Sequence, residues 1–133
     1  MRVAGKMAFV TGGASGLGRA SSLMMAKEGA KVAVSDVNAE GAQAVADEIN
    51  ALYPGQGFAY RLDVTSEGQW QEALNAAHED MGGLNVLSNN AGSGGGSTIE
   101  DTDYETWKRV HEVDTDSVFL GCKYAIPLMR DHA

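Results

Sequence analysis

The chain has 133 residues, of which 44% are hydrophobic and 21% are charged, and 10 basic against 18 acidic side chains give a net charge of -8. This length and composition predict one soluble globular domain, and the negative charge argues against nucleic acid and anionic membrane surfaces as partners. The apolar runs are too short to span a bilayer, and the N-terminal residues lack a signal-peptide pattern, so we expect a cytoplasmic protein.

Four short apolar runs predict β-strands, near residues 7–10, 32–34, 58–62 and 84–87. Each pair is separated by a segment with the length and hydrophobic period of a helix. The order β-α-β-α-β-α-β predicts an α/β fold with a parallel sheet and right-handed crossovers.

Polar side chains mark where the predicted helices begin. Asn38 is expected to cap the second helix, and Ser66 with Gln69 is expected to form a capping box at the third. Thr102 with Glu105 predicts the start of a final helical region that continues toward the C-terminus.

A glycine-rich segment, TGGASGLG, occupies Thr11–Gly18, directly after the first apolar run and at the start of a helical pattern. Gly12 can adopt backbone angles that a side chain forbids, while Gly16 and Gly18 allow a pyrophosphate and the next strand to approach closely. The phosphates would then lie on free N–H groups at a helix N-terminus. On this pattern alone, a plain strand-to-helix turn remains an alternative.

An acidic residue, Asp36, follows the second apolar run, twenty residues beyond Gly16. A carboxylate at that place can bind both hydroxyls of an adenosine ribose and repels a 2′-phosphate. The sequence has no Arg close to Asp36. We therefore predict NAD, rather than NADP, as the cofactor.

These motifs, together with Leu62-Asp63-Val64 and Asn89-Asn90-Ala91-Gly92, have the order and spacing of the short-chain dehydrogenase/reductase family, which the chain resembles over practically its whole length. The resemblance implies a Rossmann-like, doubly wound parallel sheet, truncated after the fourth strand and its following long helix. Residues 1–133 would form one NAD-binding domain, incomplete at the C-terminus.

The resemblance also implies roles for single residues. Asp63 would bind the adenine amino group and Val64 would line the adenine pocket, while Asn90, Ala91 and Gly92 would pass close to the adenosine ribose. The full set of predicted cofactor-binding residues is Gly12, Ser15, Gly16, Leu17, Gly18, Asp36, Val37, Asp63, Val64, Asn90, Ala91 and Gly92.

The family's catalytic residues are only partly represented. Asp114 occupies the position of an asparagine that contributes to catalysis in the family. The carboxylate there either lowers activity or is tolerated because the backbone carbonyl does the essential work. The family's serine, tyrosine and lysine follow a fifth strand, so we expect them beyond Ala133 and expect this chain alone to be inactive.

One pair within the chain, Tyr104 and Lys108, matches the spacing of the family's tyrosine and lysine. It lies only twelve residues after Gly92, in a segment where the family has a different pattern, so we predict that it is not catalytic. No cluster of His, Cys, Asp or Glu has the spacing of a metal site.

The predicted function is that of an NAD-dependent oxidoreductase acting on small secondary alcohols or ketones. In detail the sequence is similar to bacterial hydroxysteroid and cyclic-alcohol dehydrogenases, and we expect a homo-oligomer, a dimer or tetramer, when the protein is complete. The alternative is a dinucleotide-binding module or sensor without catalytic activity. The missing catalytic residues and Asp114 favour that alternative.

Overall fold

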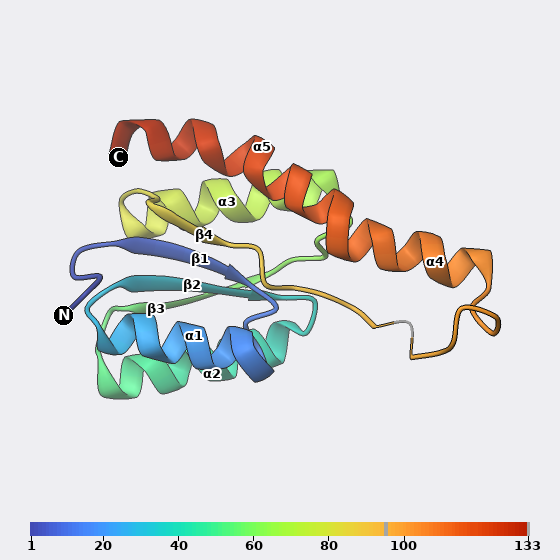
Figure 1. Cartoon of the computed structure of the whole chain (residues 1–133). Helices are drawn as coiled ribbons and strands as arrows, with labels where there is room; N and C mark the ends of the chain where they lie inside the picture. Colours follow the sequence, from blue (N-terminus) through green and yellow to red (C-terminus); the bar gives the residue numbers. More distant parts are fainter. Residues whose placement is uncertain (95, 133) are drawn as a thin grey trace.

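A four-stranded parallel sheet organises the computed structural model, which describes residues 1–94 and 96–132 (Figure 1). The predicted alternation of strands and helices is confirmed. The elements in chain order are β1 (Met7–Thr11), α1 (Gly16–Lys27), β2 (Lys31–Asp36), α2 (Ala39–Leu52), β3 (Gly57–Arg61), α3 (Glu67–Met81), β4 (Val86–Ser88), α4 (Tyr104–His111) and α5 (Ser117–Met129).

The strands lie in the order β3-β2-β1-β4. The chain therefore proceeds outward from β1 through β2 to β3 and then returns to pair β4 with the other side of β1. In open α/β sheets, ligands bind at such a reversal, beyond the carboxyl ends of the strands. In this fold the reversal lies between β1 and β4.

Both faces of the sheet are covered, which explains why the strands read as continuous apolar runs. Figure 1 shows α1 and α2 on one face and α3 and α5 on the other. Successive residues of β1 point to opposite faces: Phe9 packs with Trp70 and Leu74 of α3, while Val10 packs with Val34 and residues of α2. All of these side chains are buried.

Of the three predicted helix starts, the one at Asn38 is confirmed and the other two are correct only in part. Asn38 caps α2 by accepting a hydrogen bond from Gly41 N, and Ser66 caps α3 by accepting one from Gln69 N. The reciprocal half of the capping box is absent, because the Gln69 Oε1 atom accepts instead from Asp63 N at 2.8 Å and from Arg61 Nη1 at 3.2 Å. The final helical region begins after Asp103, not Thr102: the Asp103 side chain accepts from Thr106 N.

The predicted long helix after the fourth strand is divided. A π-helical turn, Glu112–Asp116, joins α4 to α5, and α4 extends away from the sheet (Figure 1). Helix α5 returns over the sheet and approaches α3 closely at Gly121, where a Cβ atom would lie 2.8 Å from the Trp70 ring. An ion pair of 3.0 Å between Lys123 and Glu67 also links the two helices.

Candidate functional site: a pocket at the carboxyl ends of the strands

The glycine-rich turn between β1 and α1 has the backbone that its sequence predicts. Gly12 and Gly16 have φ angles of +63° and +53°, in the left-handed region that favours glycine. Helix α1 begins at Gly16, so its first N–H groups have no carbonyl partner within the helix, and Gly16 and Leu17 line the pocket described below. This part of the chain is suited to hold a negatively charged group.

Gly18 allows a close approach between α1, the glycine turn and the segment after β4. A Cβ atom at Gly18 would lie 2.1 Å from the Gly12 carbonyl oxygen and 2.6 Å from Asn90 Nδ2. Gly18 does not line the pocket described below. The absence of a side chain at Gly18 therefore allows α1 to pack directly against the backbone of the glycine turn.

The end of β4 is hydrogen-bonded to the glycine turn. The Asn90 side chain donates from Nδ2 to the carbonyl oxygen of Thr11 at 2.9 Å. In return, the Thr11 hydroxyl oxygen accepts from Asn90 N at 3.0 Å and from Ala91 N at 2.9 Å. Thr11 and Asn90 thus hold the two sides of the sheet reversal together, a role for Thr11 that the sequence motifs did not indicate.

Two carboxylates lie near the carboxyl ends of the neighbouring strands: Asp36 at the end of β2 and Asp63 just after β3. Asp36 accepts from Ala14 N at 3.1 Å through Oδ2 and from Asn38 N at 3.0 Å through Oδ1. These bonds fix its carboxylate beside the glycine turn.

The second carboxylate, Asp63, accepts at Oδ1 from the hydroxyl and the N–H of Thr65, at 2.7 Å and 2.9 Å. The hydroxyl contact, followed by the N–H contact, lowers the pKa of Asp63 below its ordinary value.

These segments enclose a pocket of about 610 Å³, within the range of small-molecule sites. Every predicted cofactor-binding residue except Gly18 lines it, and Leu62, Ser93 and Val113 are additions that the motifs did not indicate. The lining residues are Gly12, Ser15, Gly16, Leu17, Asp36, Val37, Leu62, Asp63, Val64, Asn90, Ala91, Gly92, Ser93 and Val113.

The lining holds two acidic side chains and no Lys or Arg among the described residues. A phosphate in this pocket would therefore interact with the N–H groups of the turn rather than with a basic side chain. Across the described part of the chain, no group of three or more His, Cys, Asp or Glu residues is arranged to hold a metal ion. Within the same part, no helix has the length and apolar character to cross a membrane.

Asp114 lies in the π-helical turn at the edge of the pocket. Its Oδ1 atom accepts a hydrogen bond of 2.7 Å from Ser93 N, directly after Gly92. Asp114 is exposed and does not itself line the pocket. Its contact with the pocket runs through the backbone of Ser93.

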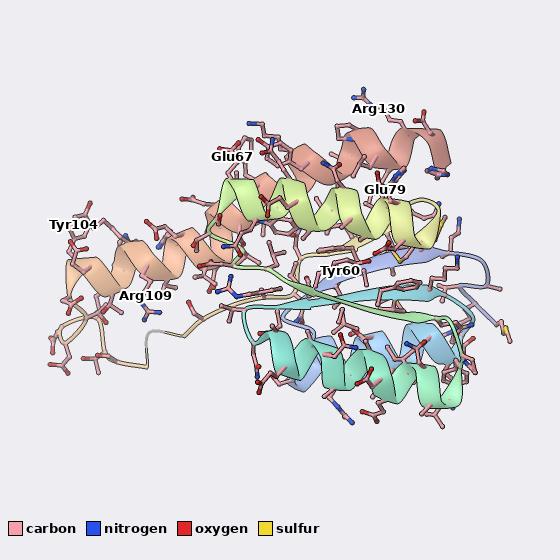
Figure 2. The ribbon with its side chains drawn as sticks, turned by 180° about the vertical axis from the view of Figure 1, so that it is seen from behind. Tyr60, Glu67, Glu79, Tyr104, Arg109 and Arg130 are labelled. Atoms are coloured by element: carbon pink, nitrogen blue, oxygen red, sulfur yellow. The ribbon has the colours of Figure 1, made fainter. Side chains whose placement is uncertain are left out.

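Tyr104 and Lys108 lie far from this arrangement. Figure 2 shows Tyr104 at the outer end of α4, away from the sheet. The Tyr104 side chain is 71% exposed, and the Lys108 ammonium pairs with Glu105 at 2.8 Å. Neither residue lines the pocket, as their position in the sequence predicts.

The chain is similar to known proteins both in sequence and in fold. The family model described as short chain dehydrogenase matches residues 6–133. A 2,5-dichloro-2,5-cyclohexadiene-1,4-diol dehydrogenase of Sphingobium indicum is 46% identical over 126 residues, which are 95% of this chain and 50% of that protein. A 3-beta-hydroxysteroid dehydrogenase of Comamonas testosteroni is 39% identical over 130 residues, 98% of this chain and 50% of that protein.

Among solved structures, a short-chain type dehydrogenase/reductase from Mycobacterium marinum superposes with a TM-score of 0.91 at 32% identity, covering 98% of this chain and 52% of that one. The chain spans about half the length of the curated relatives it matches.

Proposed function

Because this chain belongs to the short chain dehydrogenase family, we propose that it is the dinucleotide-binding portion of an NAD-dependent oxidoreductase acting on secondary alcohols or ketones. The observation that carries the proposal is the pocket itself. One cavity is lined jointly by the glycine turn, the carboxylates Asp36 and Asp63, and the segment Asn90–Gly92 that follows β4. A plain strand-to-helix turn requires no such convergence.

In the proposed complex, the chain's own groups bind the two ends of an adenosine diphosphate. The free N–H groups at the start of α1 hold the phosphates, and the Asp36 carboxylate accepts hydrogen bonds from the ribose hydroxyls. Asp63 lies beside the apolar side chains of Leu62 and Val64, where an adenine ring can pack and its amino group can donate to the carboxylate. NAD, when bound, supplies the hydride acceptor.

The preference for NAD over NADP follows from charge. Asp36 is anchored by two backbone N–H groups and lines the pocket, and the described lining has no basic side chain to neutralise a further phosphate. A 2′-phosphate beside this carboxylate would be repelled. The same residues that orient the ribose therefore discriminate against the phosphorylated cofactor.

The proposed substrate is a secondary alcohol carried on a ring. The names of the relatives, a cyclohexadiene-diol dehydrogenase and a hydroxysteroid dehydrogenase, support this class. Within the described residues, Tyr104 and Lys108 lie outside the pocket, so we propose that the proton-transfer residues belong to the half of the protein that these relatives have beyond the matched region.

Two measurements test the proposal. Calorimetric titration with NAD and NADP should show saturable binding of NAD and much weaker binding of NADP. An assay of NADH absorbance with cyclopentanol, cyclohexanol and a 3β-hydroxysteroid then measures turnover. Absence of dinucleotide binding would reject the proposal, whereas NAD binding with no turnover on any alcohol, in a protein that includes the remaining half, would favour the non-catalytic module.

A further inference from the structure

One hydroxyl group in the wall of the pocket has no hydrogen-bond partner in the described part of the chain. Ser93 lines the pocket, yet its Oγ atom is buried and has no hydrogen-bond partner among residues 1–94 and 96–132. The other unpartnered buried side-chain oxygens of these residues belong to Gln56 and Asn89, which do not line the pocket. A buried hydroxyl without a partner costs free energy, so a partner supplied from outside would relieve the cost.

The backbone of Ser93 is held in place by the π-helical turn between α4 and α5. The Asp114 carboxylate accepts from Ser93 N at 2.7 Å, and the preceding residue, Val113, lines the pocket. The acceptor is a carboxyl group, and a hydrogen bond to an ionised oxygen is stronger than one to a neutral amide. The π-helical turn thus fixes the main chain of Ser93 beside the pocket.

Ser93 shares the pocket with a group of side chains that suit one part of a dinucleotide. The apolar side chains of Leu62, Val64 and Val113 line the same pocket, together with the carboxylate of Asp63. Flat apolar surface beside a hydrogen-bond acceptor suits an aromatic base that carries an amino group. This is the chemistry of adenine, and its ribose adds hydroxyl groups that can donate to or accept from a serine.

We propose that Ser93 is a cofactor-binding residue whose hydroxyl forms a hydrogen bond with the adenosine half of the dinucleotide, and that Asp114 is the positioning residue that holds Ser93 there. The inference rests on the proposed function. It assigns Asp114 a role through the backbone of Ser93, separate from any direct part in proton transfer.

The first test compares Ser93→Ala with Ser97→Ala, an exposed serine of the same loop that does not line the pocket. The affinity of Ser93→Ala for NAD and for ADP-ribose should fall equally, by about 3- to 10-fold, the loss expected for one neutral hydrogen bond. Its melting temperature should stay unchanged or rise, because the substitution removes an unpartnered buried hydroxyl. Ser97→Ala should match the parent in both measurements.

The outcomes separate this inference from the proposed function. If the parent protein binds no dinucleotide, both are rejected. If the parent binds NAD and Ser93→Ala binds it equally well, only the present inference is overturned. A fall in melting temperature together with affinity would show a structural serine instead, and a loss for NAD without one for ADP-ribose would refute the adenosine assignment.

The second test addresses Asp114, with Thr115→Ala as the control, since Thr115 is exposed in the same π-helical turn and does not line the pocket. Asp114→Ala should weaken ADP-ribose binding about as much as Ser93→Ala, while Asp114→Asn, which keeps an acceptor oxygen, should restore most of the affinity. The double variant should bind no more weakly than the weaker single variant. Multiplicative losses, or failure of Asp114→Asn to restore binding, would overturn the positioning role.

Discussion

Replacing Asp36 with Asn should change the cofactor preference of the pocket. The carboxylate is half-buried, lines the pocket and is anchored by Ala14 N at 3.1 Å and Asn38 N at 3.0 Å. An amide of nearly the same shape retains one acceptor oxygen but removes the negative charge. The substitution therefore tests charge with little change in volume.

The expected magnitude follows from two effects. A hydrogen bond between a ribose hydroxyl and a charged acceptor contributes about 1.5 to 3 kcal/mol, so its weakening should reduce NAD affinity by about tenfold or more. Loss of repulsion toward a 2′-phosphate should improve NADP binding, and because Asp36 is partly exposed to solvent, the high-dielectric estimate of about 1 kcal/mol for each unit of phosphate charge applies. Together these effects should lower the NAD-to-NADP affinity ratio by about 50-fold or more.

Calorimetric titration of parent and variant with both dinucleotides measures this ratio. The matched control is Asp47→Asn, which removes the same charge from an exposed position on α2 that does not line the pocket, and it should leave both affinities unchanged. A melting curve verifies that Asp36→Asn retains its fold despite the altered contacts with two backbone N–H groups. An unchanged ratio in a folded variant would refute the assignment of Asp36 to the ribose.

Three further predictions concern the walls of the pocket. Gly18→Ala should abolish dinucleotide binding and lower the melting temperature, because its Cβ would lie 2.1 Å from a backbone oxygen of the glycine turn. The control is Gly68→Ala in α3, where the space around the glycine is open, and this variant should be as stable as the parent or more stable. Equal melting curves for the two variants would contradict the prediction. Thr11→Val should lower the free energy of unfolding by about 2 to 4 kcal/mol, measured by urea denaturation, since it leaves two N–H groups of the segment after β4 without their acceptor. The pKa of Asp63 is lowered chiefly by the Thr65 hydroxyl, so its contribution to stability should be present above the ordinary Asp value of about 4 and be lost as the pH falls through the lowered pKa. Thr65→Val should reduce that pH dependence of the melting temperature, and an identical pH profile in the variant would count against the hydroxyl as the cause.

Local features of the sequence predict most of the secondary structure. The apolar runs locate all four strands, because a strand buried on both faces needs apolar side chains at successive positions, and Asn38 marks a helix start that the structure retains. Prediction failed where a side chain had a choice of partners. Gln69 has the spacing for a capping box, but its oxygen accepts instead from Arg61 Nη1 at the end of β3 and from Asp63 N just beyond it.

The candidate site divides in the same way. Gly12, Gly16 and Asp36 can be predicted to line a pocket because each lies at or after the carboxyl end of a strand whose place in a parallel sheet is implied by the alternating pattern. Ser93 carries no comparable signal. Its role depends on a contact with Asp114, twenty-one residues away, and on a π-helical turn that interrupts the predicted long helix.

The sequence by itself therefore determined the order of the elements, the glycine turn and the strand-end carboxylates, since these depend on neighbours within a few positions along the chain. Only the tertiary structure decided that Gly18 packs against the Gly12 carbonyl and the Asn90 side chain, that Thr11 joins the ends of β1 and β4, and that Ser93 and Val113 line the pocket. The physical reason is the return of the chain to pair β4 beside β1. That pairing brings together segments almost eighty residues apart, and no local pattern encodes which of their atoms will meet.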